Sequence, residues 1–394
     1  MSLNLDKSSW KRVAFGDVVR NLNVTVKDPE GAGIDRVIAM EHLDPGELKI
    51  SRWGTIKDGT TFTRRVKPGQ TLFGKRRAYQ RKAAYAEFDA ITSADVLVFV
   101  ADPRQLLPEF LPFLVQSDGF YDHALGTSAG SLSPRTNWRD LANYELDLPP
   151  LDVQKRLADS LWAVERHRLT LRREECAVSA AEDHWLDNAY ADAKMKHVKV
   201  RSLIDSGELE LLTGPFGSTL SASQYTSHGV PVIHPSFIVD GRLTVDHKSF
   251  VSEDTAARLN RWKVRVGDIV FMRKRDVTRS ALVTPREEGW ILGSDCILIR
   301  THGGSLLPGF VRAMLRAPTA RANLTRRAPG TAMPGINERS LADLSFPYLG
   351  LGAQGATIAS WTLLGESKHA VQEEWRALTT LRSTLLRQIF GGHN

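Results

Sequence analysis

The strongest constraint on the fold of this chain is an internal repeat with a period of about 200 residues. "LLPEFL" from Leu106 matches "LLPGFV" from Leu306, and Asp95 matches Asp295 at the same shift. The shift also aligns Asn137, Arg139, Leu141, Ala142 and Gln154 with Asn337, Arg339, Leu341, Ala342 and Gln354. Solenoid repeats have periods of about 20 to 50 residues, so this one indicates two similar domains in tandem.

Each half of the repeat divides into the same two parts. The first part holds short β-branched and aromatic runs such as "ADVLVFV" and "GWILGSDCILIR", separated by turn residues, which is typical of strands. The second part has no proline and carries apolar residues at helical spacing. The repeat therefore predicts an α+β chain with mixed α/β domains over 1–150 and 200–350, long helices over 151–192 and 351–394, and a linker over 193–199.

Each long helix carries a narrow apolar stripe that must be buried. The stripes contain Leu157, Leu161, Val164, Leu171, Val178 and Trp185, and Leu364, Val371, Trp375, Leu378, Leu385 and Ile389. An antiparallel coiled coil of the two helices would bury both stripes, and the alternative is that each helix packs on its own domain. The stripes are interrupted by polar residues, which suit a short or partly solvated coil: Arg168, Glu175, Glu182, Lys368 and Arg382.

Charge and composition narrow the class of protein. The 394 residues include 52 Lys and Arg against 45 Asp and Glu, a net charge of +7, which favours a nucleic acid and, more weakly, an anionic membrane as partner. The two cysteines, Cys176 and Cys296, have no spacing typical of a zinc site or a disulfide framework. Neither a secretory signal nor a membrane-spanning stretch is recognisable. We expect a soluble protein of the reducing cytoplasm.

Motifs of catalysis are missing from the sequence. It contains no phosphate-binding loop, no dinucleotide-binding glycine pattern, no zinc-protease motif and no nucleophile elbow. "DLPPL" at 147–151 differs from the Asp/Asn-Pro-Pro-aromatic motif of enzymes that methylate amino groups, because of the extra Leu148 and the missing aromatic residue. It is better explained as a Pro-Pro that ends a strand before a helix. We expect no enzyme and no cofactor or metal site in this chain.

Binding features are stronger, and the main one is a basic segment that occurs twice. "VKPGQTLFGKRRAYQRK" at 66–82 and "VRVGDIVFMRKRDVTR" at 264–279 each lead from an apolar strand into a cluster of Lys and Arg. Such cations neutralise phosphates, and Arg, Gln and Tyr side chains reach bases. A charge run is often only a solvated surface. Its recurrence at one place in the repeat favours a shared binding role.

Three loops rich in small residues are further candidates for phosphate or base contacts. "GTSAGSLSPRTN" at 126–137 and "RRAPGTAMPGIN" at 326–337 occupy equivalent places, and "LLTGPFGSTLSASQY" at 211–225 contains a Gly-Pro-Phe-Gly-Ser turn. Small residues expose backbone N–H groups to a phosphate. All three also fit ordinary turns.

The whole layout resembles the specificity subunits of type I restriction-modification systems. The resemblance rests on "LPPLDVQKRLADSL" from Leu148, on "GPFGS" at 214–218 and on the final "WRALTTLRSTLLRQIFGG". It implies two target-recognition domains, held about 10 base pairs apart by a coiled coil of the two helices, that read a split, asymmetric DNA target. It also implies two methyltransferase subunits and motor-nuclease subunits as partners, with S-adenosylmethionine, ATP and Mg bound to those partners.

Together these features predict the residues that contact DNA. The main candidates are Lys75, Arg76, Arg77, Arg273, Lys274 and Arg275, followed by Tyr79, Gln80, Arg81, Arg279, Ser131, Arg135, Thr331 and Asn337. Three alternatives remain at this point. They are a stand-alone regulatory or antirestriction DNA-binding protein, a degenerate nuclease or methyltransferase, and a membrane-surface binder, which would need apolar anchors beside the charge.

Overall fold

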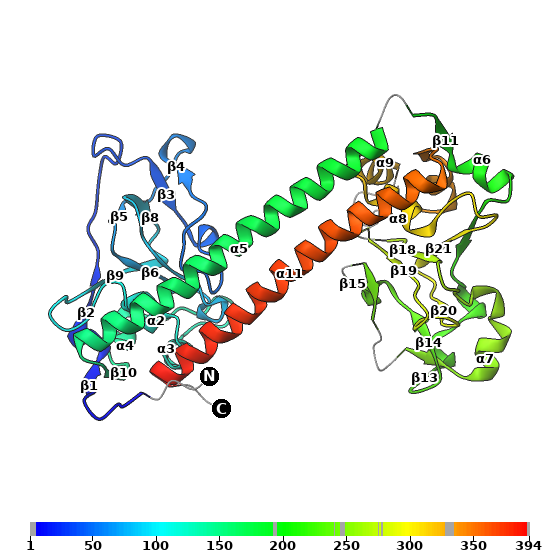
Figure 1. Cartoon of the computed structure of the whole chain (residues 1–394). Coiled ribbons are helices and arrows are strands. Elements are labelled where there is room, and N and C mark those ends of the chain that lie inside the picture. Colours follow the sequence, from blue (N-terminus) through cyan, green and yellow to red (C-terminus); the bar gives the residue numbers. More distant parts are fainter. Residues whose placement is uncertain are drawn as a thin grey trace. The chain divides into compact units, whose positions relative to one another are not determined.

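The computed structural model divides the chain into two compact units. Unit 1 contains residues 1–173 and 372–394, and unit 2 contains residues 174–371. The structure describes residues 5–191, 195–239, 241–244, 249–274, 276, 279–327 and 335–391. Two long helices are divided between the units, so that one part of each helix belongs to unit 1 and the other part to unit 2. They are α5 (Leu151–Ala191), 41 residues long, and α11 (Leu351–Phe390), 40 residues long (Figure 1).

Unit 1 is built on two four-stranded sheets. The first is antiparallel with the order β2-β9-β6-β7, and the second has the order β4-β3-β8-β5 with a parallel β3/β8 pair. The strands are β1 (Lys11–Ala14), β2 (Val19–Leu22), β3 (Arg36–Ile38), β4 (Gly54–Thr55), β5 (Arg64–Val66), β6 (Thr71–Gly74), β7 (Ala83–Tyr85), β8 (Ala90–Thr92), β9 (Val96–Ala101) and β10 (Glu145–Leu148). Four short helices complete it: α1 (Phe15–Val18), α2 (Leu111–Val115), α3 (Asp118–Gly126) and α4 (Trp138–Leu141).

Unit 2 repeats this plan of two four-stranded sheets. Its sheets have the orders β12-β21-β18-β19, antiparallel, and β13-β17-β14-β20, with a parallel β14/β20 pair. The strands are β11 (His197–Lys199), β12 (Leu209–Thr213), β13 (Tyr225–Thr226), β14 (Val230–Ile233), β15 (Ile238–Val239), β16 (Arg242–Leu243), β17 (Phe250–Val251), β18 (Ile269–Met272), β19 (Ser280–Leu282), β20 (Ile291–Leu292), β21 (Cys296–Thr301) and β22 (Ser345–Pro347). The helices are α6 (Val200–Asp205), α7 (Glu253–Arg258), α8 (Pro308–Arg316), α9 (Pro318–Arg327) and α10 (Glu338–Ala342).

In unit 1, two prolines and a buried glutamine make the step from sheet to long helix. β10 ends at Leu148 and α5 begins at Leu151, so Pro149 and Pro150 separate them as the sequence predicts. Proline lacks the N–H that a continuing strand would need but fits the first turn of a helix. Gln154, in that first turn, is fully buried, and its side chain ties the helix to the loop before α2 through Leu107 N–H, which donates to Oε1 at 2.9 Å.

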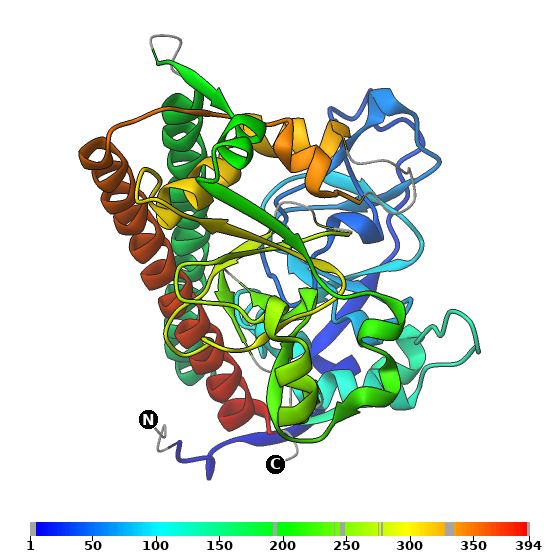
Figure 2. The same cartoon turned by 90° about the vertical axis from the view of Figure 1, so that its right-hand side faces the viewer.

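Within unit 1, α5 and α11 pack antiparallel on each other and on the domain. Leu157 and Leu161 share one buried cluster with Leu386 and Ile389. Charged residues lie within this packing. Glu165 Oε2 accepts from Arg168 Nη1 at 2.7 Å and lies 3.3 Å from Arg382 Nε. The segment before β1 and the last turn of α11 meet at Lys7 (Figure 2), where Lys7 Nζ donates to Ile389 O at 3.0 Å.

Unit 2 contains the other part of each long helix. Leu186 and Trp361 join one buried cluster, and Glu182 accepts from Trp361 Nε1 at 2.7 Å. The Arg312 guanidinium lies 4.8 Å from the centre of the Trp361 ring. Burial lowers the pKa of Arg312 to about 10. The predicted fold class, with two mixed domains and a pair of long helices, is confirmed.

The expectation of partial solvation was wrong for three of the charged residues in the helix stripes. Arg168, Glu182 and Arg382 are each less than a tenth exposed. Each has partners from a distant part of the chain, such as Glu47, whose Oε1 accepts from Arg168 Nη2 at 3.3 Å. An ion is tolerated in the interior when partners compensate for lost hydration, and those partners are not visible in a helix pattern.

Candidate nucleic-acid interface

In unit 1, the basic segment and the first small-residue loop form one surface. We call these two segments, residues 75–82 and 126–137, loop pair 1. The Thr136 N–H donates to Lys75 O at 3.0 Å, and the Arg77 N–H donates to Pro134 O at 2.7 Å. Arg76 Nε also donates to Ser133 Oγ at 2.5 Å. Segments more than 40 residues apart in the sequence are thus joined edge to edge.

The second segment of loop pair 1 is a small hairpin. Ala129 and Arg135 exchange two backbone hydrogen bonds, of 3.0 and 2.9 Å. At its base the Thr127 and Thr136 hydroxyls lie 3.2 Å apart. These bonds hold the tip of the hairpin beside the arginines of the first segment, with Leu132 92% exposed at its end.

The first segment has an unusual backbone. Arg77 (φ 54°) and Arg81 (φ 50°) are left-handed, and among the described residues they are the two non-glycine residues with positive φ. They flank the single turn η3 (Ala78–Gln80), on which Tyr79 is 57% exposed. A left-handed residue with a side chain costs of order 1 to 3 kcal/mol and persists where surrounding contacts fix it. Such residues cluster at functional sites, which favours a binding role for this turn.

One carboxylate organises the cations of loop pair 1. Asp95 O accepts from the Lys75 N–H at 3.0 Å. Its side-chain oxygens lie 3.3 Å from Arg135 Nε and 3.9 Å from Arg76 Nη1. Both arginine side chains remain about half exposed, so their outer edges face solvent with the positive charge oriented by Asp95.

Unit 2 has the same arrangement at the equivalent place. The Arg273 N–H donates to Asp295 O at 2.9 Å, and the Ile336 N–H donates to Arg273 O at 2.8 Å. Lys274 Nζ lies 2.8 Å from Asp295 Oδ1. The basic segment after β18 therefore meets the end of the second small-residue loop, as it does after β6.

The Gly-Pro-Phe-Gly-Ser turn of unit 2 contributes a residue that sequence reasoning did not select. Phe216 is half exposed, and the Arg273 guanidinium lies 4.7 Å from its ring centre. Gly214 permits this turn, because a Cβ there would lie 1.9 Å from Gly293 O. The Gly-Pro-Phe-Gly-Ser turn was the sequence feature that could have identified Phe216. Its contact with Arg273 could not be predicted, because the sheet brings the ends of β12 and β18 to opposite sides of β21.

The structure brings together most of the predicted contact residues, and their DNA-binding role stays a prediction. Loop pair 1 contains Lys75, Arg76, Arg77, Tyr79, Gln80, Arg81, Ser131 and Arg135. Arg273, Lys274 and Asn337 lie at the equivalent place in unit 2, where Asn337 Oδ1 caps α10 by accepting from the Ser340 N–H at 2.9 Å. Arg275 and Thr331 lie outside the described residues.

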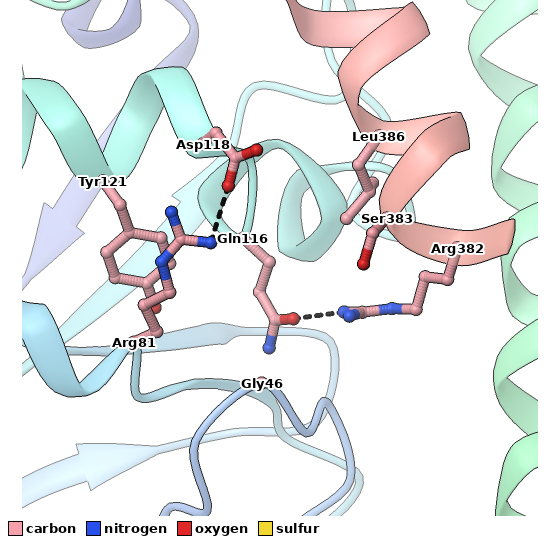
Figure 3. Close-up of a pocket in the computed structure, with 8 residues that line it drawn as sticks. All are labelled: Gly46, Arg81, Gln116, Asp118, Tyr121, Arg382, Ser383 and Leu386. Atoms are coloured by element: carbon pink, nitrogen blue, oxygen red, sulfur yellow. Dashed lines mark hydrogen bonds and ion pairs between the residues drawn. The ribbon is translucent and has the colours of Figure 1, made fainter. Parts of the chain in front are cut away.

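Two of the predicted arginines, Arg81 and Arg279, donate to residues outside the paired loops of their units. Arg81 Nη1 donates to Asp118 Oδ1 at 2.6 Å, and its guanidinium lies 5.1 Å from the Tyr121 ring centre. Arg81, Asp118 and Tyr121 line a pocket of about 70 Å³, and Arg382 of α11 lines the same pocket from another side (Figure 3). Burial raises the pKa of Tyr121. Arg279 Nη2 donates to Ile238 O.

Among the described residues, no three His, Cys, Asp or Glu side chains gather in a way that could hold a metal ion. In the same part of the chain, no helix is both long and apolar enough to cross a membrane.

Comparison with known proteins supports the resemblance found in the sequence. A 152-residue stretch is 26% identical to the specificity subunit of the type I restriction enzyme EcoDI of Escherichia coli. The stretch covers 38% of this chain and 33% of that protein's length. No family model matches the chain.

Solved structures with the same fold cover nearly the whole chain. The S subunit of a type I restriction-modification system from M. genitalium superposes with a TM-score of 0.61 at 14% identity, covering 100% of both chains. A chain from a structure of the assembly and conformational transition of the type I R-M system gives 0.59 at 18% identity, covering 98% of both. The chain thus resembles type I specificity subunits in sequence and shares the fold of these structures.

Proposed function

We propose that this chain is the DNA-reading specificity subunit of a type I restriction-modification system, with one half of a split target read by each unit. The observation that carries the proposal is the repeated basic segment. In both units it leaves the same strand of an antiparallel sheet, is hydrogen-bonded to the same Asp position, and meets the same small-residue loop. Fixed cations on an exposed edge suit phosphates, and side chains between them reach bases.

The two units differ in the side chains they present, and this supports an asymmetric target. Loop pair 1 exposes Tyr79 and Leu132, whereas unit 2 exposes Phe216 against Arg273. Base identity is read by the chemistry and shape of side chains at base edges. Two units with one scaffold and different tips should therefore prefer different half-sites.

The docking of modification subunits is assigned to the long helices. From Leu351 to Gly365, α11 has no charged residue, although Ala356, Ala359 and Leu363 on it are exposed. The equivalent stretch of α5 carries five charged residues, Asp152, Lys155, Arg156, Asp159 and Glu165. An exposed uncharged helix face is typical of a surface that a partner protein covers. We assign it to one of two methyltransferase subunits, with motor-nuclease subunits joining the complex.

Catalysis belongs to the partners in this proposal. The chain itself is non-catalytic, S-adenosylmethionine is bound by the methyltransferase subunits, and ATP and Mg are bound by the motor-nuclease subunits. The complex acts on DNA in the cytoplasm. The role of this chain is to bind and orient the duplex so that adenines of both half-sites reach the methyltransferase subunits.

The decisive experiment is a genome-wide map of methylated adenines in host cells with and without this chain. We expect one split, asymmetric motif with a fixed gap to lose methylation when the gene is deleted and to regain it on complementation. Exchange of residues 200–350 for those of a related chain should change only one half of the motif. An unchanged methylation map, in cells where the methyltransferase subunits are expressed, would refute the proposal.

A further inference from the structure

Loop pair 1 exposes apolar side chains in an unusual place. Among the described residues of unit 1, Leu132 at 92% and Tyr79 at 57% are the two most exposed large hydrophobic side chains. They come from the two segments that form loop pair 1. A single exposed leucine is common on protein surfaces. Two such side chains on hydrogen-bonded segments that also carry arginines indicate a binding surface.

The hairpin that carries Leu132 is held by the contacts of loop pair 1. Its strands are closed by the Ala129–Arg135 bonds, and its outer side is fixed by the bonds from Arg77 N–H and Arg76 Nε to residues 134 and 133. A side chain presented by a fixed loop loses little conformational freedom when it is buried in a partner. The hairpin is therefore suited to insert its tip into another molecule.

Two arginines lie beside this apolar tip. Arg76, which donates to Ser133 beside Leu132, and Arg135 have side chains 42% and 52% exposed. A partner that covers Leu132 must accept these cations at its rim and an apolar group at its centre. Duplex DNA has this combination, because phosphates flank a stack of apolar base faces. Many DNA-binding proteins insert Leu, Phe or Met between base pairs in this way.

We propose that loop pair 1 inserts Leu132 between two base pairs of its half-site, with Tyr79 packing on the opened stack. This inference rests on the proposed function and extends it, because it names the residue that deforms the DNA. The arginines around the tip hold the two backbones while the step opens. Since pyrimidine–purine steps unstack most easily, the half-site read by unit 1 should contain a TA or CA step at the point of insertion.

The test uses the full-length chain and duplexes that carry the methylated motif with 2-aminopurine placed in turn at each position of one half-site. We expect binding of the wild-type chain to raise the fluorescence at one step, because the base loses its stacking partner. L132S should abolish this rise and weaken binding by about tenfold, whereas L132F should retain both.

V24S is the matched control, because Val24 is also an exposed apolar residue of unit 1, at 50%, and lies outside loop pair 1. It should bind and unstack the DNA as the wild type does. Specific binding without a fluorescence rise at any step, or an unchanged rise with L132S, would overturn the insertion and leave the proposed function intact. Failure of the wild-type chain to distinguish the motif from a scrambled duplex would overturn both.

Discussion

Gln154 and Gln354, 200 residues apart, make the same three hydrogen bonds in their own units. The side-chain oxygen accepts from Leu107 N–H at 2.9 Å in unit 1 and from Leu307 N–H at 2.8 Å in unit 2. The amide nitrogen donates to two carbonyls, of Gln105 and Pro149 in one case and of Ser305 and Leu349 in the other, all at 2.8 Å. One duplicated side chain thus fixes the start of each long helix to its domain.

Replacement of Gln154 by Ala should destabilise unit 1. The Leu107 N–H and the Gln105 and Pro149 carbonyls, which are partly or fully buried, lose the buried Gln154 side chain as their partner. An unsatisfied buried group costs about 1 to 3 kcal/mol. We expect a total loss of about 2 to 4 kcal/mol, partly offset by water entry, measured by urea unfolding. K155A, on the same helix and with a side chain 66% exposed, should change stability by less than about 0.5 kcal/mol.

Removal of the Asp95 charge should strengthen DNA binding without changing its sequence preference. In D95N the backbone bond to Lys75 remains, while Arg135 and Arg76 lose their ion pair and become available to phosphates. We expect affinity for target and scrambled duplexes to rise together, with a steeper dependence on salt concentration. D89N is the control, because Asp89 pairs with Arg65 at 3.1 Å outside loop pair 1. An equal effect of both substitutions would indicate only a change in net charge.

Substitution of Ala356 by Arg should block partner docking on α11. The long charged side chain would stand on the uncharged face and leave the helix intact, because arginine is a good helix former. In co-purification with the methyltransferase subunits, we expect recovery to fall at least tenfold, while binding of the purified chain to DNA stays unchanged. A257R tests the specificity of the effect, since Ala257 is also exposed but lies on α7. Normal co-purification of A356R would exclude this face.

Loss of Glu165 should disrupt the helix pair in unit 1. Glu165 is fully buried, and E165A would leave Arg168 and Arg382 in the interior without it. Burial already lowers the pKa of Arg382, and Glu165 opposes that effect. Removal of one partner from a buried ion pair costs about 3 to 5 kcal/mol, which thermal unfolding would detect. D159A removes an exposed pair with Lys155 and should cost less than about 1 kcal/mol.

The two cysteines should differ in reactivity. Cys176 is exposed and Cys296 is buried, where burial raises the pKa of its thiol. A raised pKa disfavours the thiolate, which is the reactive form, so native protein at about pH 8 should react with a thiol reagent at Cys176 alone. Both should react in denaturant. C176S would confirm the assignment by losing the native reaction.

The sequence alone determined the architecture, because the relevant signals are local or repeated. The shift of 200 residues identified two domains of one kind, and the Pro-Pro before Leu151 marked the change from strand to helix. Periodicity along one segment is enough to predict a long helix and its apolar stripe. The basic segments were found in the same way, since each follows directly on a strand.

Only the tertiary structure decided which of those cations share a surface. Arg77 and Arg81 lie in one cluster of the sequence, yet the first is bonded to the 126–137 hairpin and the second to Asp118. Such partners are set by chain segments far apart, whose meeting depends on sheet order and register. For the same reason, Arg168 and Arg382 could not be predicted to be buried, because compensation for a buried charge comes from residues that only the folded chain brings near.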